Sequence, residues 1–225
     1  MKLAILFSGG KDSTFTVYKA LKDGHEVKYL ISLISENPAS YMFHYPNIEL
    51  TKVLAENMGI PIITKPTKGE KEKELEDIRE VLSGIKDIDC VGAGALASRY
   101  QYDRVAGICK ELGLKTYTPC WMQDAEEHWK ELLDAGFEVI VTGIAAEGLT
   151  KKWLGRKVGW KELEELKKIR GKTGIHLGFE GGEGETLVLD CPLYKKRVEV
   201  VESKIVMENE CTGRLEIGKV ELKGK

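Results

Sequence analysis

The stretch Leu3-Ala4-Ile5-Leu6-Phe7-Ser8-Gly9-Gly10-Lys11-Asp12-Ser13 predicts a buried strand that turns through glycines into a helix. Its apolar half is short enough for a strand inside a sheet. Gly9 and Gly10 let the backbone turn tightly and leave room for a ligand, because they carry no Cβ atom. A helix that starts here presents unpaired N–H groups and the positive end of its dipole. We therefore expect this turn to bind a phosphate group.

The side chains of the turn support the same expectation. Ser8 and Ser13 supply hydroxyl donors, and Lys11 supplies positive charge. The spacing is neither that of a Walker A loop nor that of G-x-G-x-x-G. The alternative is an ordinary strand-to-helix turn in which Asp12 or Ser13 caps the helix.

Outward from this turn, strand patterns alternate with helix patterns as far as residue 144. Strands are predicted at residues 2–7, 26–34, 61–64, 88–91, 116–118 and 137–144, with helices at 14–22, 47–58, 68–80, 98–112 and 123–135. This alternation predicts an α/β parallel sheet with helices on both faces. Residues 149–172 read as one basic helix, and strands follow from Thr186 onward. We expect two domains, a nucleotide-binding α/β domain at 1–146 and a smaller α+β substrate-binding unit at 147–225.

Composition excludes several classes of protein. The 225 residues include 34 Lys and Arg against 36 Asp and Glu, a balance that does not suggest a nucleic-acid-binding surface. The longest apolar run is too short to span a membrane, and the N-terminus has no cleavage pattern of a signal peptide. The five cysteines are odd in number and form no C-x-x-C. We expect a cytoplasmic protein that does not contact a membrane.

Two further segments follow predicted strands. Ser40-Tyr41-Met42-Phe43-His44 lies after the second strand, where Met42 could cover a nucleotide base. The segment 92–105 follows the strand at 88–91. There Gly94 permits close backbone approach and Ser98 could cap a helix, while Arg99 and Arg104 could meet phosphate or carboxylate. The alternatives are a surface loop and a capped helix with surface arginines.

The segment 178–186, Gly-Phe-Glu-Gly-Gly-Glu-Gly-Glu-Thr, places three acids among four glycines. Glu180, Glu183 and Glu185 repel one another unless a cation or a donor-rich substrate offsets their charge. Such a turn could hold Mg²⁺, attract ammonium or take a proton from it. The alternative is a solvated hairpin turn.

SGGKDS at 8–13 resembles the PP-loop of the ATP pyrophosphatase superfamily. Together with five further segments it resembles the diphthine–ammonia ligase (diphthamide synthase) family. Those segments are SYMFH at 40–44, GAGALASRYQYDRV at 92–105, PCW at 119–121, GLTKKWLG at 148–155 and EGGEGETLVLDCPLYKK at 180–196. The additional C-terminal domains of many eukaryotic members are absent, so we expect an archaeal-like protein.

The resemblance implies a ligase that uses ATP and ammonium to amidate diphthine, a modified histidine of translation elongation factor 2, through an acyl-adenylate. It implies nucleotide contacts from Ser8, Gly9, Gly10, Lys11, Asp12, Ser13, Met42, Gly94 and Ser98. It implies substrate contacts from Tyr41, His44, Arg99, Tyr100, Gln101, Arg104, Glu180, Gly182 and Thr186. Asp12 is expected to hold Mg²⁺, and the expected catalytic residues are Lys11, Asp12, Glu183 and Glu185.

Other functions stay open on the sequence alone. One is a PP-loop ATP pyrophosphatase that modifies tRNA, and another is a non-catalytic module that binds ATP or AMP. The basic segment 151–172 is a candidate docking face for the elongation factor or nearby RNA, with a charged solvent-facing surface as the alternative. A homodimer also stays open, since the sequence does not set the oligomeric state.

Overall fold

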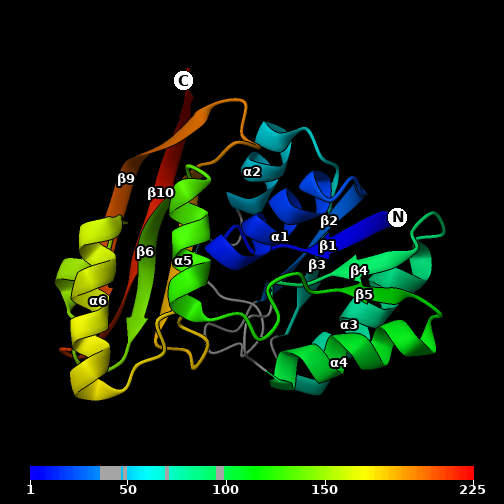
Figure 1. The fold of residues 1–225 in the computed structure, drawn as a ribbon. Helices are drawn as coiled ribbons and strands as arrows, with labels where there is room; N and C mark the ends of the chain where they lie inside the picture. The colour runs from blue at the N-terminus through cyan, green and yellow to red at the C-terminus, as the bar shows by residue number, and fades with distance from the viewer. Residues whose placement is uncertain (36–46, 48–49, 69–70, 95–98) are drawn as a thin grey trace. The chain divides into compact units, whose positions relative to one another are not determined.

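The computed structural model describes residues 1–35, 47, 50–68, 71–94 and 99–225 (Figure 1). The chain divides into two compact units, Met1–Trp121 and Met122–Lys225. This division falls earlier in the chain than the boundary expected between residues 146 and 147. The helix expected at 123–135 and the strand expected at 137–144 both fall in the second unit, which accounts for the difference.

The first unit holds a parallel sheet. Within the described residues its five strands are β1 (Lys2–Leu6), β2 (Glu26–Ser35), β3 (Ile62–Thr67), β4 (Cys90–Gly92) and β5 (Lys115–Tyr117), in the order β3-β2-β1-β4-β5. Every neighbouring pair in this sheet is parallel. The connecting helices are α1 (Lys11–Lys22), α2 (Thr51–Met58), α3 (Lys71–Gly84) and α4 (Arg99–Glu111). The α/β parallel sheet expected from the sequence is confirmed.

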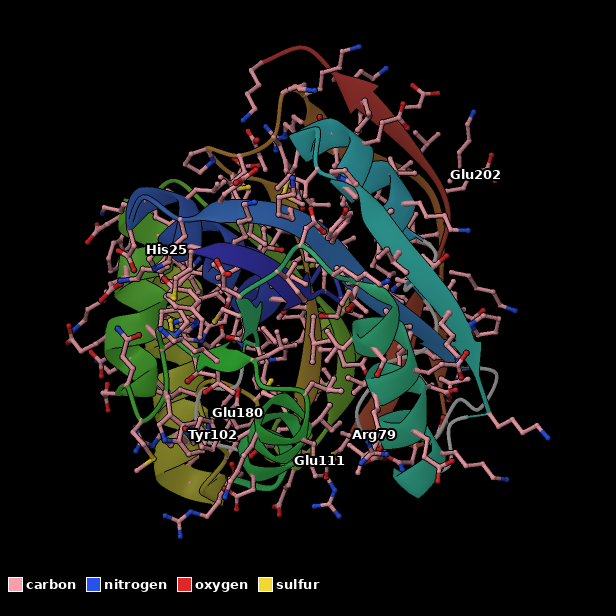
Figure 2. All side chains as sticks on the ribbon, turned by 90° about the vertical axis from the view of Figure 1, so that its right-hand side faces the viewer. His25, Arg79, Tyr102, Glu111, Glu180 and Glu202 are labelled. Atoms are coloured by element: carbon pink, nitrogen blue, oxygen red, sulfur yellow. The ribbon has the colours of Figure 1, made fainter. Side chains whose placement is uncertain are left out.

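Helices cover both faces of this sheet, with α1 on one face and α3 and α4 on the other (Figure 1). On the α3 and α4 face, Ala4 and Val91 from the strands pack in one cluster with Ile78 and Leu82 of α3. An ion pair between Arg79 and Glu111 joins α3 to α4 at 2.9 Å (Figure 2). The charged segment at 68–80 therefore carries a buried apolar stripe on an otherwise solvated helix.

The strand order places a topological switch between β1 and β4. From β1 the chain builds β2 and β3 on one side, then crosses to add β4 and β5 on the other side. In open α/β sheets, ligands bind beyond the carboxyl ends of the strands at such a point. The glycine-rich turn after β1 lies there.

The second unit is built on an antiparallel sheet. Its strands, as far as the structure describes the chain, are β6 (Glu138–Ala145), β7 (Lys157–Val158), β8 (Gly184–Asp190), β9 (Arg197–Met207) and β10 (Thr212–Lys223). β6 pairs with β8 on one side and with β7 and β10 on the other. Its helices are α5 (Ala125–Asp134), α6 (Trp160–Thr173) and the short 3₁₀ helix η2 (Lys151–Trp153). The smaller α+β unit expected at the end of the chain is confirmed.

The expectation that residues 137–144 extend the parallel sheet is wrong. β6 is antiparallel to every strand with which it pairs, and it belongs to the second sheet. Residues 139–144 are buried throughout, so the strand lacks the alternation that marks a half-solvated antiparallel strand. A continuous apolar run predicts a buried strand but does not say which sheet the strand joins.

The expectation of one helix over residues 149–172 is also wrong. This stretch forms η2, then β7, and only then α6. Gly155 adopts a positive φ of 80°, and its N–H donates to the carbonyl of Val141 at 2.8 Å. Arg156 then binds Glu162 at 3.0 Å and Glu165 at 2.6 Å. Backbone pairing to β6 therefore outweighs helix propensity here.

Across the described residues, no helix has both the length and the apolar character required to cross a membrane.

The interior of the second unit depends on one buried indole. Trp129 of α5 is fully buried, and its Nε1 donates to the carbonyl of Leu177 at 2.8 Å. Trp129→Phe keeps most of the apolar volume but leaves that carbonyl without its donor. We expect a loss of about 1–3 kcal/mol in the free energy of unfolding, measured by chemical denaturation.

Trp160→Phe is the matched control, because Trp160 is 52% exposed. We expect it to change stability by less than about 0.5 kcal/mol. Equal losses in the two variants would contradict the assigned role of Trp129.

Candidate functional sites

The turn after β1 is fixed by its own serines. The Oγ of Ser13 accepts from the N–H of Ser8 at 3.2 Å, lies 3.2 Å from the Oγ of Ser8, and donates to the carbonyl of Gly10 at 3.2 Å. The N–H of Gly10 in turn donates to the Oγ of Ser8 at 3.4 Å. Both hydroxyls therefore bind the turn itself and set its shape.

The first turn of α1 starts within the motif, earlier than the expected start at Thr14. Gly10 is the N-cap residue in an extended conformation, and no side chain caps the helix there. Gly9 has a positive φ of 78°, which a residue with a side chain rarely adopts. As a result, Lys11, Asp12 and Ser13 form the first turn of the helix, where backbone N–H groups favour an anion.

Lys11 and Asp12 form a charge pair inside this turn. The Nζ of Lys11 lies 2.7 Å from the Oδ2 of Asp12, and Lys11 is only 2% exposed. A buried ammonium is stable only beside a partner of opposite charge. The pair places the Lys11 ammonium at the start of α1. An anionic ligand there would interact with this ammonium and with the helix dipole.

Neighbouring strands hold the turn on both sides. On the β2 side, the N–H of Phe7 donates to the carbonyl of Ile31 at 2.8 Å, and the Oγ of Ser32 donates to the carbonyl of Phe7. On the β4 side, a Cβ atom built on Gly94 would lie 2.7 Å from both the carbonyl carbon of Asp12 and the amide nitrogen of Ser13. Gly94 therefore contacts the first turn of α1 so closely that only glycine fits.

The second candidate loop, at residues 176–186, belongs to the second unit. Glu183 accepts from two backbone N–H groups, that of His176 at 2.9 Å and that of Gly181 at 2.8 Å. Phe179 and Gly182 have positive φ angles of 62° and 85°. The loop is thus tightly folded, and Gly181 and Gly182 at its tip are exposed, so the solvated turn stays open as the alternative.

Glu185 lies at the start of β8 and pairs with Gly143 of β6. A Cβ atom built on Gly143 would lie 3.1 Å from both the Cβ and the Cγ of Glu185 and 3.3 Å from its carboxyl carbon. The side chain of Glu185 therefore lies across the face of Gly143. Thr186, next on β8, pairs with Val141.

Some of the other residues predicted for the site lie in the described part of the chain, and some do not. Tyr41, Met42, His44 and Ser98 lie outside the described residues, as do the side chains of Tyr100 and Gln101. Arg99 is exposed at the first residue of α4, and Arg104 is partly buried in the same helix. Tyr102 stacks on Trp121, with ring centroids 4.4 Å apart. Glu180 is partly buried in the loop at residues 176–186, which is called the acidic loop below.

The basic segment 151–172 is partly neutralised within its own unit. Arg156 stacks over the ring of Trp153 at 4.6 Å and binds Glu162 and Glu165. The hydrogen bond from Arg156 lowers the pKa of Glu165 below its ordinary value. Lys167 binds Glu126 and Glu164. These pairs reduce the positive charge that this segment offers to a partner.

Sequence reasoning missed three residues that shape these loops. Ser32 and Gly143 interrupt apolar strands, and a polar residue or a glycine inside a buried strand is the signal that could have identified them. The third, His176, contributes a backbone N–H, for which the sequence carries no signal.

The parallel sheet and the glycine–serine turn at its switch point define an open α/β protein. Comparisons with known proteins narrow this class. The diphthamide synthase N-terminal domain model matches residues 1–116, and the diphthamide synthase C-terminal domain model matches residues 124–222. The chain therefore belongs to the diphthamide synthase family, and the two matches fall on the two compact units.

Named relatives agree with this family. The chain is 34% identical to the diphthine–ammonia ligase of Schizosaccharomyces pombe, over 92% of this chain and 37% of that protein. It is 34% identical to the diphthine–ammonia ligase of Rattus norvegicus, over 93% of this chain and 86% of that protein. It is 31% identical to the Homo sapiens protein of the same name, over 93% of this chain and 86% of that protein. The chain thus spans little more than a third of the yeast relative.

A solved structure is also similar, the predicted subunit of tRNA methyltransferase from Methanocaldococcus jannaschii. The TM-score is 0.49 at 15% identity, over 85% of this chain and 98% of that chain.

Substitution of Gly94 tests whether its contact with α1 stabilises the turn after β1. Gly94→Ala places a methyl group against the peptide between Asp12 and Ser13, so the first turn of α1 must move. We expect the free energy of unfolding to fall by about 1–3 kcal/mol, measured by chemical denaturation.

Gly107→Ala is the control, since it lies in α4 with no atom within 4 Å of an added Cβ. Alanine is the better helix former, so we expect this variant to gain up to about 1 kcal/mol. A Gly94→Ala protein as stable as the wild type would show that the turn is not held by this contact.

Proposed function

We propose that this protein catalyses the ATP-dependent amidation of diphthine on translation elongation factor 2 with ammonium, giving diphthamide, AMP and pyrophosphate. The observation that carries the proposal is the match of both units to the diphthamide synthase family, with relatives named diphthine–ammonia ligase over more than nine-tenths of this chain. The geometry of the turn after β1 supports the use of a nucleotide.

The residues of this turn fit a triphosphate. The positive φ of Gly9, the N-terminus of α1 and the charge of Lys11 favour an anion. Gly94 leaves space for the backbone of the first turn of α1. Ser8, Gly9, Gly10, Lys11, Asp12 and Ser13 are the proposed phosphate contacts. Met42, Gly94 and Ser98 are the proposed contacts to the rest of the nucleotide.

Mg²⁺, when bound with the triphosphate, supplies positive charge that offsets the charge on pyrophosphate. Asp12 is its proposed carboxylate ligand. One oxygen of Asp12 already binds Lys11, so the carboxylate would be shared between the two cations. Among the described residues, no cluster of three metal-ligating side chains offers an alternative site.

The proposed chemistry has two steps. An oxygen of the diphthine carboxylate attacks the α-phosphorus of ATP, the bond from that phosphorus to the oxygen of the β-phosphate breaks, and pyrophosphate leaves. The nitrogen of ammonia then attacks the acyl carbon and loses a proton, the bond from that carbon to the phosphate oxygen breaks, and AMP leaves. The first step supplies the leaving group that a free carboxylate lacks.

Ammonium must lose a proton before its nitrogen can attack. The acceptor is proposed to be one of two carboxylates, Glu183 or Glu185, and a carboxylate near the cation would also raise its local concentration. Tyr41, His44, Arg99, Tyr100, Gln101, Arg104, Glu180, Gly182 and Thr186 are the proposed contacts to the substrate. Glu180, Gly182 and Thr186 lie in the second unit, of which residues 147–225 are the proposed substrate-binding domain.

We further propose that the reaction takes place in the cytoplasm. All five cysteines, each within the described part of the chain, are free thiols, as is usual in a reducing compartment. Burial raises the pKa of Cys109 to about 12 and that of Cys191 to about 11, so both thiols stay protonated at neutral pH. The homodimer kept open above is checked by sedimentation equilibrium.

The function is tested by following AMP and pyrophosphate with three acceptors: diphthine-bearing elongation factor 2, tRNA, and none. We expect AMP to appear with the elongation factor and ammonium, in equal amount with the amide measured by mass spectrometry. Release that depends on tRNA would favour a tRNA-modifying enzyme. Binding of ATP without turnover would favour a nucleotide-binding module.

Asp12→Ala tests the phosphate loop within this reaction. It removes the carboxylate that pairs with Lys11, which is also the proposed Mg²⁺ ligand. We expect AMP formation to fall on the order of 10²-fold or more. Asp134→Ala, an exposed position at the end of α5, should leave the rate unchanged. Full turnover by Asp12→Ala would remove the phosphate loop from the mechanism.

A further inference from the structure

We infer that Glu183 is a positioning residue, whose carboxylate folds the acidic loop and so leaves Glu185 to handle ammonium. The inference deepens the proposed function and rests on it only where it assigns ammonium to Glu185. The folding role itself rests only on the geometry of residues 176–185.

The carboxylate of Glu183 is used at both oxygens. Oε1 accepts from the N–H of His176, seven residues earlier, and Oε2 accepts from the N–H of Gly181, two residues earlier. These donors belong to the backbone, so one carboxylate closes both sides of the loop. Hydrogen bonds from N–H groups to a charged acceptor are roughly twice as strong as neutral ones.

The loop that Glu183 closes has a strained backbone. Phe179 has a positive φ of 62°, which is uncommon for a residue with a bulky side chain. Its N–H donates to the carbonyl of His176 at 2.9 Å, and Gly182 donates to the carbonyl of Phe179 at 3.3 Å. Strained backbone of this kind persists only where surrounding contacts hold it. The two bonds to Glu183 are such contacts.

Gly181, which has no side chain, also leaves space for the carboxylate of Glu183. A Cβ atom built on Gly181 would lie 2.8 Å from Oε1 and 3.1 Å from Oε2 of Glu183. The backbone of Glu183 is fixed as well, because its carbonyl accepts from the N–H of Ala145 at 2.8 Å. The residue therefore ties the loop to the end of β6.

A general base must accept a proton without losing its own support. A proton taken up by Glu183 would compete with the two backbone N–H bonds and loosen the loop. Glu185 follows the loop at the start of β8, where its side chain lies across Gly143 of β6. By holding residues 181–183, Glu183 sets where β8 begins and so where the carboxylate of Glu185 stands.

Amide hydrogen exchange of the full chain, followed by NMR, tests the folding role without any substrate. Glu183→Ala should speed exchange at His176 and Gly181 by about tenfold or more, because both donors lose their acceptor. Glu183→Gln keeps only one acceptor oxygen, so at least one of the two amides should exchange faster. Glu185→Gln is the matched control and should leave both amides protected. Unchanged protection in both Glu183 variants overturns the inference, and circular dichroism verifies that each variant is folded.

The pH dependence of amidation separates positioning from proton transfer. Glu183→Gln should lower the rate at every pH and keep the shape of the wild-type profile. Glu185→Gln should change that shape and raise the KM for ammonium. Loss of the acidic limb in Glu183→Gln, with retention in Glu185→Gln, would assign the base to Glu183 and overturn the inference. Wild-type protein that forms no amide would refute the proposed function, while the exchange result still decides the role of Glu183.

Discussion

The first unit depends on one backbone contact, the approach of Gly94 to the peptide between Asp12 and Ser13. Two loops that leave neighbouring parallel strands meet there with no side chain between them. The contact fixes the start of α1 beyond the carboxyl ends of β1 and β4. The helix dipole, the N–H groups of the first turn and the Lys11–Asp12 pair are consequently concentrated at the switch point of the sheet.

The two candidate loops apply the same physical device. In each, glycines permit a compact path, and a small number of polar side chains bind the backbone of the loop itself. Ser8 and Ser13 do so after β1, and Glu183 does so before β8. Groups that hold a loop in this way are pre-organised, so less ordering is required when a ligand binds. Some residues expected to contact the nucleotide or to act in catalysis therefore also hold the backbone of their own loop.

The sequence was most informative where local chemistry decides the structure. The alternation of strands and helices predicted the parallel sheet, and the apolar run before Ser8 predicted β1 and the turn that follows it. It failed where tertiary partners decide. Both faces of β6 are apolar, and such a strand suits the interior of a parallel or an antiparallel sheet. Its residues therefore do not reveal that it pairs antiparallel with β8. The break at Gly155 was missed because the Lys and Glu residues around it fit a helix until backbone pairing to Val141 competes.

The candidate site divides along the same line. Residue types and spacing were enough to predict the glycine–serine turn at the start of a helix. Phosphate binding there and the roles of the acids at 180–185 stay predictions. Residue types and spacing could not show that Glu183 binds His176, because a backbone N–H seven residues away is the same in every sequence. Nor could they show that Gly143 makes room for Glu185, since the two residues are far apart in the chain. Distinguishing the two acids required the folded structure.

The central claim is that the turn after β1 binds the phosphates of a nucleotide. It is tested most directly by titrating ¹⁵N-labelled protein with ATP and Mg²⁺ and following the backbone amide resonances. The account predicts that the largest shifts fall on Gly9, Gly10, Lys11, Asp12, Ser13 and Gly94, and that they saturate with one nucleotide per chain. Saturable shifts elsewhere with these amides unmoved, or no shift at millimolar nucleotide, would contradict it.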